Sequence, residues 1–468
     1  MRVPPLRSCF LSDAAARGAA SLLALLNLAA CGGDEDEARH PKPIDRPEIP
    51  AAQDIQTTDL ALDLGALAGK ATLVVVPSAG KVTLDVSGLT VTKVTLDGHA
   101  VTPEITSGML QIPVPGAPDA VTVAVEYAFR ARTPATFDGW MPSLGVSFVW
   151  PYSCSNLFPC DPSLSDGVSF TMSIAGVEDG LTAIYPTSTR GDGPAYMPAV
   201  AVGDYTELEL GTTTAGTTLS AWYLPGRNAL EDATKGTAHL VGAFDYFEQT
   251  YGPYHFGPVA GTVEVDWGAD SWGGMEHHPY VHVGKFDFND EEAQVHEAGH
   301  GWFGDGVRIA CWEDFVLSEG TTTYIAARAL EQVEGPNEWD YYVDDFLVPI
   351  CEGSSHDPTL VNTIVLPDTC GEIDFVHDDL WSITPYMKGA CFYEEVADVI
   401  GPDALDQTIG EFYTTHVGQA ARMQDMIDLI EARAEASDRP AIQALVSDWL
   451  LSFDCPENYA DRCRTHGN

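Results

Sequence analysis

Residues 296–320 read HEAGHGWFGDGVRIACWEDFVLSEG, and this stretch carries the strongest functional signal in the chain. His296 and His300 are four residues apart, so on a helix both imidazoles face the same side and can bind one metal ion. Glu297 follows the first histidine, where its carboxylate can take a proton from water that the metal activates. A catalytic zinc site keeps three protein ligands. Glu319, nineteen residues beyond His300, is therefore the predicted third ligand of a single zinc ion.

The alternative to a zinc site is a surface helix that carries two solvated histidines. Ala298 and Gly299 are small enough for close helix packing, and Trp302 and Phe303 are large and apolar. Residues of this kind favour burial over a solvated face. We therefore interpret the segment as part of a buried metal site.

The same stretch resembles the zinc signature of the aminopeptidase N family, gluzincin metallopeptidases that include leukotriene hydrolase. The residues that carry the resemblance are His296, Glu297, His300, Trp302, Phe303, Gly304, Trp312, Asp314, Leu317, Glu319 and Gly320. Upstream, residues 273–277 (GGMEH) resemble the family's GxMEN box, and downstream, residues 386–390 (YMKGA) resemble its YxKGA segment. The resemblance covers roughly residues 60 to 452 and implies a short, two-domain bacterial form.

The resemblance also implies roles for the two flanking segments. The residues implied to bind substrate are Gly273, Gly274, Met275 and Glu276. A buried Glu276 carboxylate would pair with the α-ammonium of a peptide, and Tyr386 would donate a catalytic hydrogen bond to the oxyanion. His277 stands where the family has asparagine, which puts the affinity for the substrate backbone in doubt.

Further polar residues lie near these motifs in the sequence. Asp314, five residues before Glu319, is predicted to accept a hydrogen bond from the second nitrogen of a ligand histidine, as zinc-bound imidazoles usually require. The histidines at 277, 278 and 282 lack carboxylate partners at ligand spacing, so no second metal site is expected. Lys388 receives no role.

The N-terminus predicts export and lipid attachment. Three arginines precede an apolar stretch, residues 18–30, that is typical of a secretory signal. The signal segment is followed by a cysteine, and residues 28–32 (LAACG) resemble a bacterial lipobox. The cysteine of a lipobox, here Cys31, becomes the lipidated first residue of the mature chain. An ordinary signal peptide with an incidental cysteine is the alternative. We expect a protein of the bacterial cell envelope, periplasmic or on the outer surface, held to the membrane only by its N-terminal lipid.

Eight cysteines follow the predicted lipidation site Cys31: Cys154, Cys160, Cys311, Cys351, Cys370, Cys391, Cys455 and Cys463. An even number in an exported chain favours disulfides over free thiols. The natural local pairs are Cys154/Cys160 and Cys455/Cys463, which leaves Cys351/Cys370 and Cys311/Cys391 by elimination. Sequence alone does not prove this pairing.

Charge and periodicity indicate the class of protein and its domains. The formal net charge of −46 argues against nucleic-acid binding, because such a chain repels phosphates. Alternating apolar residues at 82–86 and 121–125, with a hairpin-type Asp97-Gly98 turn, predict strands, and helical periodicity begins near Ala229. The predicted segments are a lipoprotein signal at 1–30, an acidic proline-rich tether at 31–53, a β domain at 54–218, a catalytic domain at 219–454 and a tail with a disulfide at 455–468.

The expected fold is multidomain, and the resemblance implies the following domains. An all-β, saddle-like N-terminal domain precedes an α+β, thermolysin-like zinc metallopeptidase domain that ends in helices. These helices are expected at residues 292–303, 318–333, 386–400, 404–416, 423–434 and 441–450. Residues 158–160 (FPC) resemble a segment of the family's β domain. The glutamine that usually precedes this segment and contacts the substrate is missing, and residues 148–150 (FVW) occupy its region.

Three functions compete. The leading hypothesis is a lipid-anchored, zinc-dependent aminopeptidase that hydrolyses N-terminal peptide bonds. A thermolysin-type zinc endopeptidase shares the histidine motif but predicts no anchor for an α-amine, so Glu276 discriminates between the two. A non-catalytic surface binding protein usually shows a lost ligand or a lost Glu297, and neither is lost here.

Overall fold

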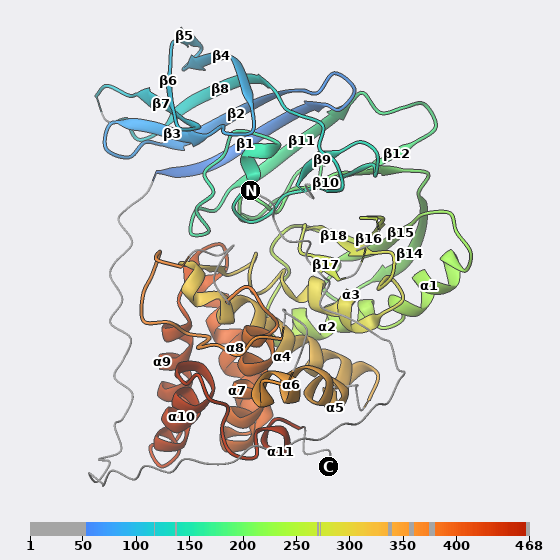
Figure 1. Ribbon diagram of the computed structural model, residues 1–468, viewed down its shortest axis with the longest axis vertical. Helices are drawn as coiled ribbons and strands as arrows, with labels where there is room; N and C mark the ends of the chain where they lie inside the picture. Colours follow the sequence, from blue (N-terminus) through green and yellow to red (C-terminus); the bar gives the residue numbers. More distant parts are fainter. Residues whose placement is uncertain are drawn as a thin grey trace, which may run out of the picture.

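The computed structural model describes residues 53–116, 118–135, 138–268, 271, 273–335, 339–354, 360–373 and 380–464. The predicted signal, Cys31 and the predicted tether up to residue 52 lie outside these residues. A β-rich N-terminal region forms one end of the molecule and the C-terminal helices form the other, with a second, mixed sheet between them (Figure 1). None of the helices that the structure describes has the length and apolar character that a membrane crossing requires.

Three sheets build the β-rich region. The first sheet has the order β11-β1-β2-β8-β4-β5, with β1 Asp54–Asp63, β2 Ala68–Val76, β4 Thr90–Leu96, β5 His99–Val101, β8 Val121–Ala128 and β11 Ser169–Ala175. The second has the order β3-β7-β6, with β3 Lys81–Asp85, β6 Glu104–Thr106 and β7 Met109–Pro113. The third has the order β12-β13-β10-β9, with β9 Gly139–Met141, β10 Val146–Phe148, β12 Thr182–Ile184 and β13 Ala201–Gly203.

The alternation that predicts these strands also decides which face of each is buried. In β8, Val121, Val123 and Val125 are buried whereas Thr122 is exposed. Asp97 and Gly98 join β4 to β5 with φ angles of 48° and 79°, the left-handed conformation that a two-residue hairpin turn requires. The predicted hairpin is therefore present at the expected residues.

A five-stranded mixed sheet supports the region of the zinc signature. Its order is β14-β15-β16-β18-β17, with β14 Thr206–Thr212, β15 Thr218–Tyr223, β16 Val259–Val265, β17 Gly274–Met275 and β18 Tyr280–Gly284. β15, β16 and β18 run parallel, and β17 forms an antiparallel edge against β18. β14 precedes residue 218 in the chain and yet pairs with β15, so this sheet begins within the segment that the sequence assigns to the β domain.

Helices cover this sheet and fill the C-terminal half. They are α1 Ala229–Gly236, α2 Leu240–Thr250, α3 Glu291–Gly299, α4 Phe315–Val333, α5 Trp339–Tyr342, α6 Val348–Glu352, α7 Thr384–Ile400, α8 Pro402–His416, α9 Met423–Arg433, α10 Arg439–Leu445 and α11 Tyr459–Cys463. Short 3₁₀ turns lie at Cys154–Asn156 and Trp312–Asp314, π-helical turns lie at Val343–Leu347 and Val446–Leu451, and β19 Arg308–Ile309 pairs with β20 Ala420–Ala421. Gly401, with a φ of 90°, ends α7, and Pro402 starts α8.

The two long helices α4 and α7 touch at a pair of glycines. A Cβ atom built on Gly389 would stand 2.6 Å from the Cα atom of Gly320, and one built on Gly320 would stand 2.8 Å from the Cα atom of Gly389. Real Cβ atoms essentially never come this close to backbone, so the contact requires glycine on both helices. Gly320 follows Glu319 and Gly389 lies three residues after Tyr386, so the glycine contact sets the distance between two predicted site residues.

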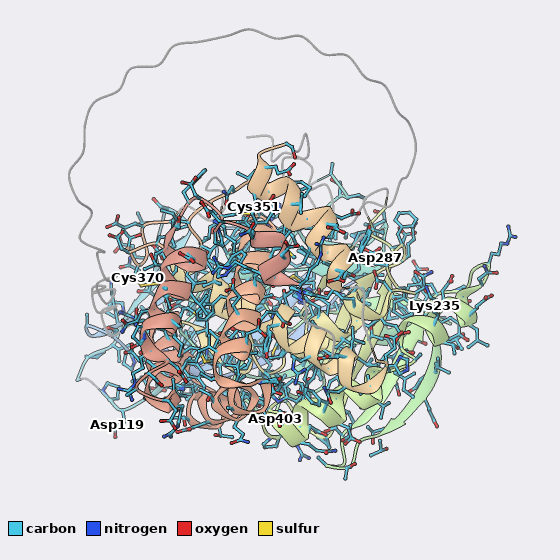
Figure 2. The ribbon with its side chains drawn as sticks, turned by 90° about the horizontal axis from the view of Figure 1, so that it is seen from below. Asp119, Lys235, Asp287, Cys351, Cys370 and Asp403 are labelled. Carbon is cyan, nitrogen blue, oxygen red and sulfur yellow. A yellow bond between two sulfur atoms is a disulfide. The ribbon has the colours of Figure 1, made fainter. Side chains whose placement is uncertain are left out.

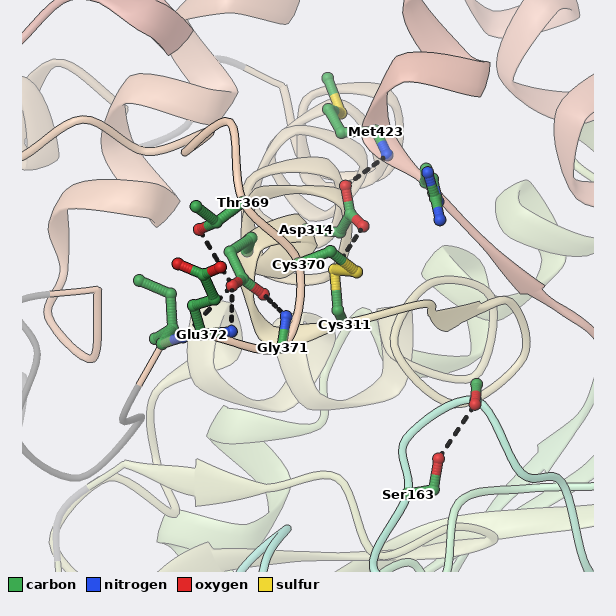
Figure 3. Close-up of a disulfide and its surroundings, with 12 residues drawn as sticks. Ser163, Cys311, Asp314, Thr369, Cys370, Gly371, Glu372 and Met423 are labelled. Carbon is green, nitrogen blue, oxygen red and sulfur yellow. Dashed lines mark hydrogen bonds between the residues drawn. A yellow bond between two sulfur atoms is a disulfide. The ribbon is translucent and has the colours of Figure 1, made fainter. Parts of the chain in front are cut away.

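Four disulfides join the eight cysteines of the described residues, and three of them differ from the predicted pairs. Cys154–Cys160 agrees with the local pair, whereas the others are Cys311–Cys370, Cys351–Cys455 and Cys391–Cys463. The predicted Cys455/Cys463, Cys351/Cys370 and Cys311/Cys391 pairs are wrong. Cys351 and Cys370 lie apart in Figure 2, and Figure 3 shows the bond between Cys311 and Cys370.

The reason for this error is that helix packing, which local spacing does not report, decides which cysteines meet. Cys463 on α11 reaches Cys391 on α7, with 4.9 Å between their Cα atoms. Cys455 reaches Cys351 on α6, with 5.6 Å between their Cα atoms. Residues 455–464 are therefore linked to α6 and α7 rather than closed on themselves.

Replacing Gly389 by alanine should destabilise the protein because the new methyl group forces α4 and α7 apart. Overpacking of this kind costs about 1–3 kcal/mol, and we expect the loss in urea denaturation together with a lower rate of catalysis. Gly226→Ala is the matched control, since its Cβ would meet no atom closer than 4.0 Å. Equal stability of the two variants would contradict the importance of the glycine contact.

Candidate active site

Helix α3 brings both histidines of the HExxH motif to one face. Asp290 caps its first turn by accepting a hydrogen bond from the Glu292 N–H at 3.1 Å, and acidic residues in that turn suit the positive end of the helix. His296 and His300 are buried, and their Nε2 atoms lie 3.2 Å apart. One helical turn therefore presents two nitrogen ligands to a common point, as the spacing predicts.

Glu319 reaches the same point from α4. Its Oε2 atom lies 3.3 Å from the Nε2 atoms of both His296 and His300. Burial raises the pKa of Glu319, but the neighbouring His300 and His296 outweigh it and hold this pKa at about 2, so the carboxylate is ionised. Two imidazoles and one carboxylate, all buried and convergent, match the donor set of a catalytic zinc site. The predicted ligands therefore fit a zinc ion.

The second nitrogen of His300 is held by backbone. Its Nδ1 atom lies 2.9 Å from the carbonyl oxygen of Phe303, so Nδ1–H donates and Nε2 keeps its lone pair for a metal. Gly304 makes this possible, because a Cβ at that residue would stand 2.7 Å from Nδ1. The partner of the second nitrogen of His300 is therefore this carbonyl, and Asp314 as the partner of the other ligand histidine stays a prediction. The Asp314 carboxylate also accepts a hydrogen bond from the Met423 N–H at 3.1 Å (Figure 3).

The GGMEH segment lies directly against the catalytic helix. A Cβ atom on Gly274 would stand 2.3 Å from Cγ of Glu297, so only glycine lets β17 pass this close. Glu276 follows, almost fully buried, and its carboxylate lies within 4.8 Å of ligand atoms of Glu297 and His300. Burial, reinforced by the charge of Glu319, raises the pKa of Glu276. The structure thus brings the proposed amine anchor and the proposed base together.

Glu297 lies at the centre of this group. It is buried, and burial together with the carboxylates of Glu276 and Glu319 raises its pKa well above the usual range despite the opposing effect of His300. A carboxylate with a raised pKa is a better proton acceptor near neutral pH than an exposed one. Its surroundings therefore suit a general base.

Tyr386 joins the site from the first turn of α7. Its ring stacks on the imidazole of His296, with ring centroids 5.7 Å apart and an interplanar angle of 20°. The edge of the Phe315 ring supports it, with centroids 6.0 Å apart. The Tyr386 ring therefore borders the ligand cluster. Its side chain is partly exposed, so part of it remains accessible to a substrate.

The β-rich region contributes aromatic rings to the same neighbourhood. Phe148, at the end of β10, packs edge-on against His277 at a centroid distance of 5.7 Å. Trp150 packs against Trp381, just before α7, at 5.5 Å. The segment that replaces the family glutamine therefore does reach the site, through rings in place of an amide.

Two residues to which the sequence assigned no role have clear partners. Lys388 is fully buried, and its Nζ donates to the carbonyl oxygens of Thr363, Ser452 and Phe453 at 3.0, 3.1 and 3.0 Å. Burial lowers the pKa of Lys388 to about 8. His278, the other residue, contacts the backbone of Glu297 at 3.1 Å. No local sequence signal reports either contact, because every partner is distant in the chain.

Comparison with known proteins agrees with this geometry. Residues 289–449 match the model of the peptidase family M1 domain. Leucine aminopeptidase 2 of Aspergillus niger is 26% identical over 358 residues, which cover 68% of this chain and 55% of that protein. Human aminopeptidase B is 28% identical over 308 residues, which cover 58% of this chain and 43% of that protein. The chain spans about half the length of the curated relatives it matches.

A solved structure extends the likeness to the whole fold. The crystal structure of an M1 zinc metallopeptidase from Deinococcus radiodurans superposes with a TM-score of 0.70 at 19% identity, covering 86% of this chain and 95% of that one. The predicted fold class, a β-rich N-terminal domain followed by a metallopeptidase domain ending in helices, is confirmed. The resemblance inferred from residues 296–320 is confirmed as well, since residues 289–449 match the peptidase family M1 domain.

Proposed function

We propose that this protein is a zinc-dependent aminopeptidase that removes N-terminal residues from peptides. The observation that carries the proposal is the convergence of four groups around His300. His296 and Glu319 lie within 4.8 Å of it as ligands of one zinc ion, and Glu276 and Glu297 lie within the same distance as anchor and base. The M1 domain and the aminopeptidase relatives support this activity.

The residues of the chain divide the reaction between them. When bound, zinc acts as a Lewis acid that polarises a carbonyl and acidifies water. Glu297 takes a proton from the attacking water and passes it to the leaving amine. Tyr386 donates a hydrogen bond to the oxyanion that develops on the substrate, and Glu276 holds the α-ammonium so that the first peptide bond meets the base.

A substrate class is supported by a relative and by the charge of the site. The Deinococcus radiodurans metallopeptidase has been solved with a Tyr-Ser-Ala substrate bound. In the present chain, the buried carboxylate of Glu276 lies beside the proposed metal ligand His300 and the proposed base Glu297, where it can pair with a free ammonium at the start of a peptide. Peptides with an unblocked N-terminus are thus the proposed substrates.

The proposed location is the bacterial cell envelope, with the protein exported and anchored through lipid on Cys31. The lipobox-like residues 28–32 and the disulfides of the described residues both support an oxidising compartment outside the cytoplasm. Attachment through the lipid alone leaves the catalytic region free to meet soluble peptides.

Zinc binding and proton transfer should depend on different residues of α3. We expect elemental analysis to find one zinc per chain, lost in His300→Ala and retained in Glu297→Gln, because Glu297 is no ligand. Glu297→Gln should still lose several orders of magnitude in the hydrolysis of aminoacyl chromogenic amides, since an amide cannot accept the proton. Glu291→Gln, on the first turn of the same helix, is the control and should stay active. A fully active Glu297→Gln enzyme would exclude this base.

Removing the Tyr386 hydroxyl should slow the reaction without loss of metal. We expect Tyr386→Phe to lower kcat by about 10²–10³-fold, the typical effect of losing one oxyanion donor. Tyr341→Phe, a change on an exposed tyrosine, is the matched control. An unchanged kcat in Tyr386→Phe would show that this tyrosine only packs against His296.

Exopeptidase action should depend on the free α-amine and on Glu276. Glu276→Gln should lose about 10- to 10²-fold in kcat/KM toward aminoacyl amides, because hydrogen bonds to charged groups are worth about 1.5–3 kcal/mol. N-acetylated substrates carry no ammonium and should be refused by the wild type. Cleavage of internal bonds in blocked peptides at the rate of free ones would favour the thermolysin-type endopeptidase instead.

Lipid attachment should depend on one cysteine. Cys31→Ser should release the enzyme from membranes into the soluble fraction, whereas Cys9→Ser, within the predicted signal, should not. Two or more acyl chains are expected by mass spectrometry, because a single chain binds a bilayer only marginally. A wild-type protein whose mature N-terminus lies elsewhere and which fractionates as soluble would refute the anchor.

A further inference from the structure

At the end of α3, the backbone carbonyl of Glu297 does not accept the usual helical hydrogen bond from the residue four positions later. The N–H of Gly301, which would continue the helical ladder to Glu297, donates to the Ala298 carbonyl instead at 3.1 Å. The Glu297 carbonyl is thereby released, and a buried carbonyl at a helix end requires another donor. His278 supplies it, with Nε2 at 3.1 Å from that oxygen.

The second nitrogen of His278 determines the state of its ring. A carbonyl can only accept, so Nε2 must carry the proton, and Nδ1 accepts from the Tyr254 hydroxyl at 2.8 Å. Phe256 stacks on the imidazole with ring centroids 5.5 Å apart and an angle of 24°. Burial lowers the pKa of His278 to about 3, so one neutral tautomer persists across the working range of pH.

A glycine just after the end of α3 accommodates this arrangement. A Cβ atom on Gly301 would stand 2.7 Å from Cε2 of Tyr254 and 3.0 Å from Cε1 of His278. Only glycine at 301 therefore leaves room for both rings against the end of α3. The contact between His278 and the Glu297 carbonyl therefore depends both on the histidine ring and on the glycine at 301.

His278 is also joined to the amine anchor. Its own N–H donates to the Glu276 carbonyl at 2.9 Å, which closes a tight turn between the two residues. A single residue thus holds the backbone of Glu276 through its N–H and the backbone of Glu297 through its ring. These are the proposed anchor and the proposed base.

We infer that His278 is a positioning residue that sets the distance between the Glu276 anchor and the Glu297 base. The inference rests on the proposed aminopeptidase function. In this arrangement His278 acts through the backbones of Glu276 and Glu297; it aligns the bound ammonium with the proton acceptor so that the first peptide bond is the one attacked. Misplacement of reacting groups by about 1 Å costs on the order of 10²-fold in rate.

The test uses three substitutions in the full-length zinc enzyme. His278→Gln keeps a donor for the Glu297 carbonyl and an acceptor for the Tyr254 hydroxyl, whereas His278→Leu keeps neither. His282→Leu is the matched control, because this histidine is equally buried on β18 and makes no contact with Glu297 that the structure describes. For each, kcat and KM are measured on an aminoacyl chromogenic amide and its N-acetylated form, with zinc content and Tm.

We expect His278→Leu to lose on the order of 10²-fold in kcat at full zinc content and to discriminate less between free and acetylated substrates. His278→Gln should recover most of kcat, and His282→Leu should lower Tm without the selective effect. The inference is overturned if His278→Leu keeps the wild-type kcat, or if both His278 variants lose activity only in step with Tm. A wild-type enzyme inactive on free aminoacyl amides would overturn the proposed function and this inference together.

Discussion

The contact between Gly320 on α4 and Gly389 on α7 is the constraint on which the site depends. No side chain separates the two backbones, so the helices cross more closely than any other pair of residues would allow. Glu319 therefore faces the histidines of α3 while Tyr386 stacks on His296. The same logic recurs at Gly274, where β17 passes against Glu297. Glycines at these contacts let the backbones approach closely, and this approach sets the distances between the functional side chains.

Close packing also gathers negative charge in a buried space. Glu276, Glu297 and Glu319 are almost fully excluded from water and lie near one another. Uncompensated buried charges are costly, and burial raises the pKa of both Glu276 and Glu297. A divalent cation at the histidines and an ammonium at Glu276 would offset this cost. The charge of the proposed ligands is thus opposite to the charge of the carboxylates that would bind them.

Long-range connections hold the helices that carry these groups. Cys391–Cys463 and Cys351–Cys455 attach the end of the chain to α7 and α6. Lys388, two residues after Tyr386, binds three backbone carbonyls from segments on either side of α7 in the chain. The turn that presents Tyr386 is therefore fixed by residues far from it in sequence. Rigidity at the reacting centre comes from distant parts of the fold.

The sequence by itself determined the features that arise from short-range geometry. The spacing of His296 and His300, the alternation of β8, the Asp97-Gly98 turn and most helix positions depend on residues within one or two turns of each other, and these were predicted. Tertiary structure alone decided three of the four disulfides, the Phe303 carbonyl as partner of His300, and the bridge from His278 to Glu297. Each of these depends on which elements pack together in space, and periodicity along the chain carries no record of that packing.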